Sequence, residues 1–187
     1  MKKIMPQDVI DIYEYERRRD KYVRAYQQAK RGRIFNLGPA IVVHFHTFDT
    51  VFFQLHEFLR SQRVRDASEV EAHLHIYNSL LPEAGHLLAT LQVDFPRKET
   101  IQQLLGLPQQ LADGHLHIRA GDEAVTGTPQ SNEKSPVAFV DFSFPESCIQ
   151  KLEDTTSDLS LHATLAEYEY SLSLNSNARQ AMLTDLS

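Results

Sequence analysis

Three histidines and a glutamate lie within fourteen positions of the stretch VVHFHTFDTVFFQLHEFLR, residues 42–60. His44 and His46 are two residues apart, so on a strand their imidazoles would point to the same side. Zinc and non-haem iron sites are built from imidazole and carboxylate ligands, and Glu57 could supply the carboxylate. A metal-dependent enzyme that uses iron or zinc is therefore one hypothesis for this chain.

A second histidine pair, His115 and His117, has the same spacing in GHLHIRA, a segment that we predict to be a strand. Apolar residues occupy the opposite side of both segments, Phe45 in the first and Leu116 in the second. A half-buried strand shows this alternation for packing reasons alone, so we expect no cofactor. The alternative is an iron or zinc site at His44, His46, Glu57, His115 and His117.

Several familiar catalytic motifs are absent from the sequence. It holds no G-x-G-x-x-G and no G-x-x-x-x-G-K-[ST], so neither a dinucleotide site nor a P-loop is indicated. It also lacks G-x-S-x-G, C-x-x-C and H-E-x-x-H. The single cysteine, Cys148, excludes an internal disulfide and an iron–sulfur cluster held by cysteines of this chain. Whether the protein is an enzyme stays open at this point.

A long N-terminal helix is predicted over residues 5–30, where Pro6 suits the first helical position. Its apolar and aromatic side chains recur at spacings of three, four and seven, forming a stripe of Ile12, Tyr15, Tyr22, Tyr26 and Ala29. Arg19 falls within this stripe. Because an unpaired buried charge is costly, we expect a structural ion pair or a carbonyl partner for Arg19; the alternative is that its guanidinium extends to water.

Two central helices are predicted over residues 49–64 and 68–81, the second capped by Ser68. On the first of them, Phe53, Glu57 and Arg60 cluster on the side opposite the apolar stripe. Aromatic and arginine residues are frequent anchors of protein interfaces, so these three residues predict a docking or self-association surface. The alternative is that the first or the last helix of the chain covers them.

Strands dominate the second half of the chain. Alternating or apolar segments are found at residues 86–96, 114–120, 136–145, 159–165 and 168–174. The apolar phase shifts near Ala166–Glu167, which indicates a bulge or a turn. Between strands we expect a short helix at 98–105 and a mobile polar loop at 121–136. A C-terminal helix capped by Asn175 or Ser176 closes the chain.

This order of elements, with helices early and strands late, predicts an α+β fold with a mainly antiparallel sheet. Its helices are the long N-terminal helix, the two central helices and the C-terminal helix. The length of 187 residues fits a single domain over residues 1–187.

Charge is distributed unevenly along the chain. Residues 1–36 hold ten Lys and Arg against five Asp and Glu, whereas the rest holds nine against twenty. Nucleic-acid binding through the basic first helix is therefore a weaker alternative, opposed by the acidic pI of 5.8. No apolar run approaches the roughly 20 residues that span a bilayer, and the first residues lack a secretory signal, so we expect no membrane partner and a cytoplasmic protein.

The motifs KIMPQDVIDIYEYERRRDKY, GRIFNLGP, DTVFFQLHEFLR, IYNSLLPEAGHLLATLQVDFP and LNSNARQAMLTDL resemble a bacterial family known as domain of unknown function 3501. The matching positions are Tyr15, Glu16, Arg19, Gly38, Pro39, Thr50, Gln54, Glu57, Leu59, Arg60, Tyr77, Asn78, Pro82, Ala89, Thr90 and Leu91. At the place of His44 the family is usually apolar, and at that of His46 it is often acidic. This departure puts a shared histidine pair in doubt.

The resemblance implies no established activity. Relatives are often encoded beside rubrerythrin-like and heterodisulfide-reductase-like iron–sulfur proteins, which implies an accessory role in a redox or peroxide-stress pathway. The expectation is therefore a non-catalytic accessory protein whose partner is a rubrerythrin-like protein or an iron–sulfur oxidoreductase. A second copy of the chain is a further candidate partner.

Overall fold

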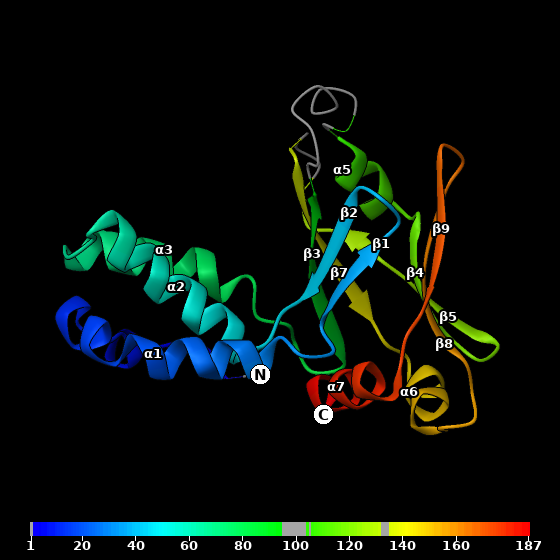
Figure 1. Cartoon of the computed structure of the whole chain (residues 1–187), viewed down its shortest axis with the longest axis horizontal. Coiled ribbons are helices and arrows are strands. Elements are labelled where there is room, and N and C mark those ends of the chain that lie inside the picture. The colour runs from blue at the N-terminus through cyan, green and yellow to red at the C-terminus, as the bar shows by residue number, and fades with distance from the viewer. Residues whose placement is uncertain (1, 95–103, 105, 132–134) are drawn as a thin grey trace. The chain divides into compact units, whose positions relative to one another are not determined.

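A computed structural model describes residues 2–94, 104, 106–131 and 135–187, and these fall into two compact units. The first, which we name the helical unit, runs up to Lys30 and continues over His46–Glu83. The second, the sheet unit, comprises Arg31–Phe45 and Ala84–Ser187. Their helices and antiparallel sheets confirm the predicted α+β class (Figure 1). Cooperative unfolding of residues 1–187 as one domain stays a prediction.

The elements of the helical unit are η1 (Pro6–Asp8), α1 (Ile12–Ala29), α2 (Phe48–Gln62) and α3 (Ala67–Asn78). The prediction that the first helix begins at residue 5 was wrong. The side chain of Asp11 caps the second and third residues of α1, so the helix begins only after it. The predicted cap of α3 was also wrong, because Asp66 accepts the backbone N–H groups of Ser68 and Glu69.

Aromatic pairs hold α1 against α2 in antiparallel orientation. Tyr26, near the end of α1, stacks on Phe53 with ring centroids 4.3 Å apart, and Tyr15, near the start of α1, stacks on His56. The apolar core of the unit is formed by Ile4, Val51, Leu55, Leu59, Leu74 and Leu81. Burying one such side chain stabilises the fold by about 1.5–3 kcal/mol. This core fixes α2 and α3 and the segment that precedes η1.

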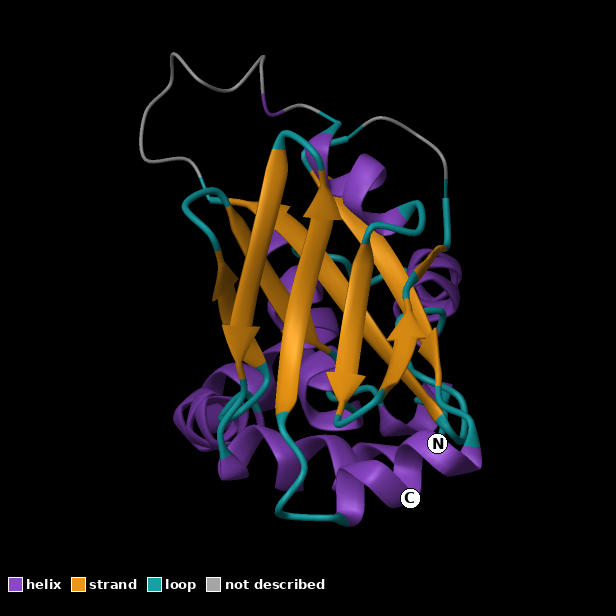
Figure 2. Cartoon of the chain, turned by 90° about the vertical axis from the view of Figure 1, so that its right-hand side faces the viewer, coloured by secondary structure: helices purple, strands orange, loops and turns teal. Residues whose placement is uncertain are grey.

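The sheet unit contains two antiparallel sheets in the described part of the chain. Its strands are β1 (Ile34–Leu37), β2 (Ile41–Phe45), β3 (His86–Val93), β4 (Leu116–Ala120), β5 (Glu123–Thr126), β6 (Thr128–Pro129), β7 (Val137–Ser143), β8 (Leu159–Leu165) and β9 (Tyr168–Ser173). One sheet has the order β1-β2-β3-β7-β6 and the other β5-β4-β8-β9. Figure 2 shows one sheet stacked in front of the other.

The inward side chains of both sheets form the core of this unit. On β7 the predicted alternation is confirmed, because Ala138, Val140 and Phe142 are buried between more exposed residues. The predicted turn at Ala166–Glu167 is also confirmed, since it connects β8 to β9 as a hairpin. The alternation therefore predicted correctly which side chains of β7 and β8 face the core, whereas on β9 only Tyr168 is buried.

Three helices complete the described sheet unit: α5 (Leu107–Ala112), α6 (Glu146–Glu153) and α7 (Ser176–Leu186). Asn175 caps α7, which confirms one of the two predicted caps. Gly32 has a φ of +68°, and a Cβ there would lie 2.8 Å from the carbonyl oxygen of Asn177. Glycine thus lets the segment before β1 pass against the start of α7. In the described ranges, no helix is long and apolar enough to cross a membrane.

The interpretation of residues 121–136 as a polar loop was wrong over much of its length. Strands β5 and β6 lie within it, and Val125 is only 5% exposed. The backbone N–H of Gly127 donates to the carbonyl of Leu116, so the chain is hydrogen-bonded between the two strands. Residues 132–134 of this segment, and residues 98–103 and 105 of the short helix expected at 98–105, lie outside the described residues.

Candidate functional site

Glu57 on α2 is the centre of a polar cluster that joins α1 to α2. The guanidinium of Arg19 donates to both carboxylate oxygens of Glu57, at 2.8 and 2.9 Å. The hydroxyl of Tyr15 donates to Oε1 at 3.0 Å, and Nη2 of Arg60 donates to Oε2 at 3.1 Å. Arg19 therefore binds a carboxylate, while 37% of its side chain remains exposed.

The pKa values in this cluster point to a structural role. Burial by itself raises the pKa of Glu57, but hydrogen bonds from Arg19, Arg60 and Tyr15 outweigh burial and lower the pKa to about 2. Burial and the neighbouring carboxylate raise the pKa of Tyr15. Efficient general acids and bases have pKa values near the working pH. The carboxylate and the phenol lie far from this range on opposite sides, so the cluster is suited to holding the helices together.

The three residues proposed as an outward-facing docking surface all contact α1. The ring of Phe53 stacks on Tyr26, Glu57 binds Arg19, and Arg60 lies 3.7 Å from a carboxylate oxygen of Glu16. The first helix, α1, therefore covers this face of α2, as in the alternative to a docking surface. Their spacing on α2 showed that they share a face, but not which element lies opposite.

Histidine His56 from the opening stretch has a packing role. Its Nε2 accepts a hydrogen bond from the backbone N–H of Ile10 at 3.0 Å, and its Nδ1–H donates to the carbonyl of Phe52 at 2.8 Å. Burial lowers the pKa of His56, which favours the neutral ring that this pattern requires. The imidazole thus fixes the start of α1 to α2.

The proposed metal ligands are divided between the two units. His44 is on β2 of the sheet unit, whereas His46 and Glu57 belong to the helical unit. On β4, the ring of His117 contacts the hydroxyl oxygens of Thr126 and Thr164 at 3.0 and 3.1 Å. Among the residues that the structure describes, no group of three or more His, Cys, Asp or Glu side chains could hold a metal ion. The carboxylate of Glu57 thus binds the guanidinium groups of Arg19 and Arg60.

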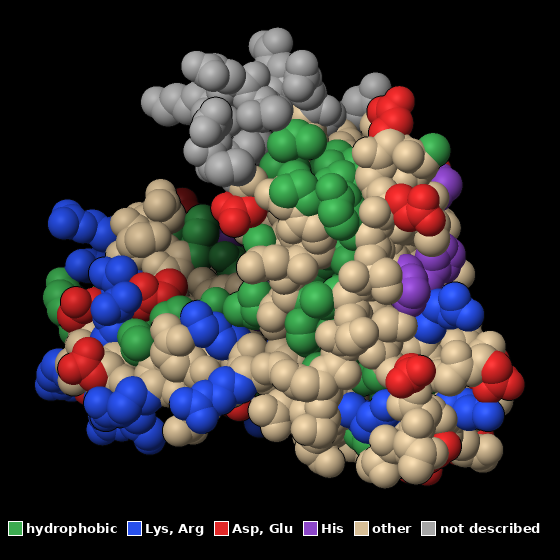
Figure 3. All heavy atoms as spheres, turned by 45° about the vertical axis from the view of Figure 1, so that its right-hand side comes forward, with side chains coloured by type: hydrophobic (Ala, Val, Ile, Leu, Met, Phe, Trp, Pro, Cys, Tyr) green, Lys and Arg blue, Asp and Glu red, His purple; other side chains and the backbone are tan. Residues whose placement is uncertain are grey.

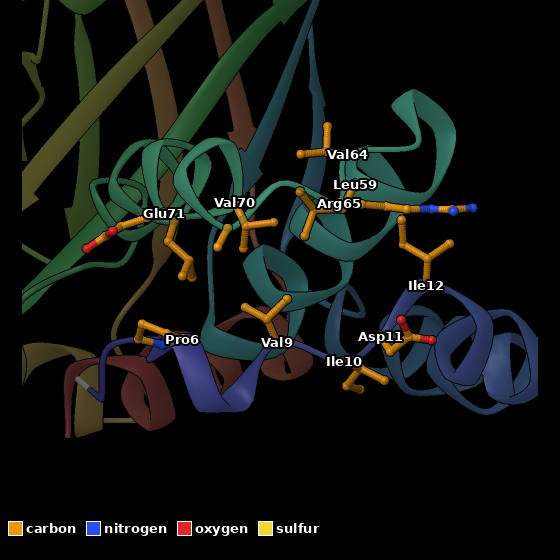
Figure 4. A pocket seen from close by; sticks show the side chains of 12 residues that line it. Pro6, Val9, Ile10, Asp11, Ile12, Leu59, Val64, Arg65, Val70 and Glu71 are labelled. Atoms are coloured by element: carbon orange, nitrogen blue, oxygen red, sulfur yellow. The ribbon is translucent and has the colours of Figure 1, made fainter.

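A pocket of about 480 Å³ opens in the helical unit between η1, the start of α1, the end of α2 and α3. The side chains that surround it are mostly aliphatic and include Val9, Ile10, Leu59, Val64, Val70 and Leu74 (Figure 4). Its volume lies within the range of about 300–1,000 Å³ that is usual for ligand pockets. Sequence reasoning missed this pocket because its walls are more than 40 residues apart in the chain and share no local pattern.

Charged groups lie at opposite ends of the pocket. Figure 4 shows Arg65 and Asp11 at one end and Glu71 at the other. The guanidinium of Arg65 donates to the hydroxyl of Tyr13 at 2.8 Å and lies over its ring. The hydrogen bonds by which Asp11 caps α1 do not cancel the charge of its carboxylate, so Arg65 and Asp11 form a pair of opposite charges at that end. An apolar groove with Arg65 and Asp11 at one end and Glu71 at the other has two chemically different ends and can orient an amphipathic ligand.

Comparison with known proteins gives a family and a fold. Residues 3–186 match the model of a family described as protein of unknown function, DUF3501. The fold is similar to the crystal structure of a novel protein of unknown function from Burkholderia pseudomallei K96243, with a TM-score of 0.90 and 20% identity over 100% of both chains. No curated protein matches the sequence.

Proposed function

The chain belongs to the DUF3501 family, and we propose that it is a non-catalytic accessory protein whose helical unit binds a segment of a redox partner protein. The single observation that carries this proposal is the apolar pocket with charged ends. It rests on side chains within one compact unit, and its position does not depend on the other unit.

The shape and lining of the pocket favour an amphipathic helix as the occupant. One wall comes from η1 and the start of α1, and the other from the end of α2 and from α3. Grooves between helices commonly receive the apolar face of a partner helix, through side chains spaced three and four residues apart. The partner helix would place its apolar side chains against Val9, Leu59 and Val70.

Charge complementarity gives this helix a direction. An acidic side chain would lie near Arg65, and a basic side chain near Glu71. Such charges contribute mainly to specificity and to the rate of association, whereas buried apolar side chains supply most of the affinity. The charges therefore predict which partner helices fit and in which orientation.

The partner class follows from the family resemblance. We propose a rubrerythrin-like protein or an iron–sulfur oxidoreductase encoded near this chain, so that the redox cofactor belongs to the partner. This chain then contributes positioning or protection of the partner and no redox chemistry of its own.

The experiment compares two glutamate substitutions on α3, Val70→Glu in the pocket and Ile76→Glu outside it. Ile76 is 55% exposed and does not line the pocket, so it is a matched control. Binding of the purified rubrerythrin-like or iron–sulfur partner is measured by titration calorimetry, after circular dichroism has shown that both variants fold. We expect Val70→Glu to weaken binding at least about tenfold, equivalent to 1.4 kcal/mol, and Ile76→Glu to have little effect.

A charge reversal provides a second arm. Glu71→Lys should weaken binding less than Val70→Glu, and a matching reversal on the partner helix should restore it. If the parent chain, Val70→Glu and Glu71→Lys bound the partner with equal affinity, the pocket would not be the site that binds it. Absence of binding to either partner class would contradict the redox assignment.

A further inference from the structure

The outer face of the sheet β5-β4-β8-β9 carries mainly hydroxyl and imidazole side chains. Strand register places Thr126, His117, His162 and Ser171 in one row across the sheet. The neighbouring row contains Arg119, Ser160 and Ser173. Figure 3 shows histidine side chains gathered on this side of the sheet unit, next to Lys or Arg side chains. This face is polar and hydrogen-bonding; Arg119 gives it a positive charge, whereas burial lowers the pKa of His117 and His162 and favours their neutral rings.

A hollow of about 470 Å³ lies beside this face, between the loop before β8, strands β8 and β9, and the start of α7. Seven serine and threonine residues line it, and three of them, Ser160, Ser171 and Ser173, also belong to the outer face of the sheet. Hydroxyl groups both donate and accept hydrogen bonds, so this lining suits a ligand rich in oxygen.

Arg179 on α7 also lines the hollow, and only 9% of it is exposed. Its Nη1 donates to the carbonyls of Leu152 and Asp154 at 2.8 and 3.0 Å, and its Nη2 donates to the carbonyl of Ser157. These partners satisfy N–H groups but carry no negative charge. Throughout the described chain, no carboxylate forms an ion pair with this guanidinium. A buried charge without a counter-ion is costly, so an anion in the hollow would be favoured.

Other charged or polar groups at the hollow modify this preference. The hydroxyl of Ser160 forms a hydrogen bond with the imidazole Nε2 of His162 at 2.7 Å, which links the hollow to the histidine row of the sheet. Ser176 is the first residue of α7, where the helix dipole favours negative charge. Asp158 also lines the hollow, and the carboxylate of Asp154 accepts hydrogen bonds from the hydroxyl groups of Thr156 and Ser157, so both carboxylates oppose an anion. An anion would therefore sit on the side of the hollow formed by Arg179 and the start of α7.

We propose that this hollow binds a phosphate-type oxyanion, and that its natural ligand is a small phosphorylated, hydroxyl-bearing molecule. Planar guanidinium groups donate well-directed, charge-assisted hydrogen bonds to phosphate oxygens. The hollow is larger than a bare phosphate needs, and its serines and threonines can bind the hydroxyl groups of a sugar. The site is separate from the apolar pocket of the helical unit and does not rest on the function proposed for it.

The experiment uses glucose 6-phosphate, inorganic phosphate and glucose as probes, each titrated into the full chain by calorimetry. Ser173→Asp places a negative charge in the hollow, and Ser143→Asp places the same charge on an exposed serine of β7 that does not line it. We expect glucose 6-phosphate to bind best and glucose not to bind. Ser173→Asp should weaken binding at least about tenfold, whereas Ser143→Asp should leave it within about twofold.

A substitution of the arginine itself tests the guanidinium. Arg179→Lys keeps the charge but loses the planar fork, and should weaken glucose 6-phosphate binding by about tenfold if the variant folds. Because Arg179 also holds three backbone carbonyls, Ser173→Asp keeps the proposal testable should Arg179→Lys unfold. Equal binding of glucose and glucose 6-phosphate, no saturable binding of either phosphate, or an unchanged affinity in Ser173→Asp would each overturn the proposal.

Discussion

The two units each contain a hollow of nearly the same size, yet the hollows are built from opposite chemistry. The helical unit surrounds about 480 Å³ with aliphatic side chains and places Arg65 at one exposed end. The sheet unit surrounds about 470 Å³ with hydroxyl groups and places the buried Arg179 against them. The volume of a hollow therefore does not identify its ligand. The side chains that line it do, and they favour an apolar helix in the helical unit and an oxyanion in the sheet unit.

The ion pairs of the units differ in a related way. In the sheet unit, the side chains of Arg33 and Asp185 are 13% and 6% exposed, and two hydrogen bonds of 2.7 and 2.8 Å join them. In the helical unit, Arg19 and Glu57 are more exposed and share the cluster with Arg60. Removing one partner costs most where the other stays buried. The sheet unit should thus respond more strongly to loss of its ion pair.

The largest expected effect is that of Asp185→Ala. It removes the carboxylate that pairs with Arg33, whose side chain is only 13% exposed, and we expect the free energy of unfolding to fall by about 3 kcal/mol. Burial raises the pKa of Asp185 despite Arg33, so the expected loss is placed at the lower end for a broken buried pair. Denaturant titration measures the change, with Asp20→Ala on the exposed side of α1 as control. If Asp185→Ala lowered the free energy of unfolding no more than Asp20→Ala does, the stronger response expected of the sheet unit would be contradicted.

The next effect concerns acid stability in the helical unit. The pKa of Glu57 is about 2 in the folded chain and about 4.3 in an unfolded one. Its stabilisation is thus complete above about pH 5 and is lost as the pH falls towards 2, amounting to on the order of 2 kcal/mol. Glu57→Gln should be less stable than the parent chain at pH 6, and the difference should shrink by pH 2.5. A difference independent of pH would contradict the ionised pair.

A smaller effect is expected for Arg19→Leu. Arg60 and Tyr15 still donate to Glu57, and the leucine can pack in the apolar stripe of α1, so we expect a loss of about 1 kcal/mol. Arg24→Leu, an exposed residue of the same helix, should change stability by less than about 0.5 kcal/mol. Identical melting temperatures of Arg19→Leu and the parent chain would mean that Arg19 contributes nothing to holding α1.

The smallest effect is expected for the histidine pair. We predict that replacing His44 and His46 with glutamine leaves the iron and zinc content of the purified, untagged protein unchanged, because neither residue is expected to hold metal tightly. Elemental analysis before and after the substitution measures this. Loss of a stoichiometric ion in the double variant would restore the metal-enzyme hypothesis.

Local patterns predicted those features that depend on neighbouring residues. Alternation oriented β7, the phase shift at Ala166–Glu167 located a hairpin turn, and the helical stripe placed Arg19 near a partner. The missed features depend on contacts distant in sequence. Glu57, the partner of Arg19, is 38 residues away, and Val125 becomes part of a strand only because β4 lies beside it.

The candidate sites were harder to predict for the same reason. Phe53, Glu57 and Arg60 were recognised as one face of a helix, but no local signal showed that α1 lies on it. Both hollows are formed by side chains of several elements. Short amphipathic α6, with Cys148 and Leu152 buried four residues apart, also went unpredicted, although this spacing was a usable signal.

The most direct test of the contrast between the hollows is a crossed titration. Parent chain, Val70→Glu and Ser173→Asp are each titrated with the purified redox partner and with glucose 6-phosphate. We expect Val70→Glu to lose binding of the partner and to retain binding of the sugar phosphate, and Ser173→Asp to do the reverse. If either substitution weakened both ligands equally while the fold stayed intact, the two hollows would not be separate sites of opposite chemistry.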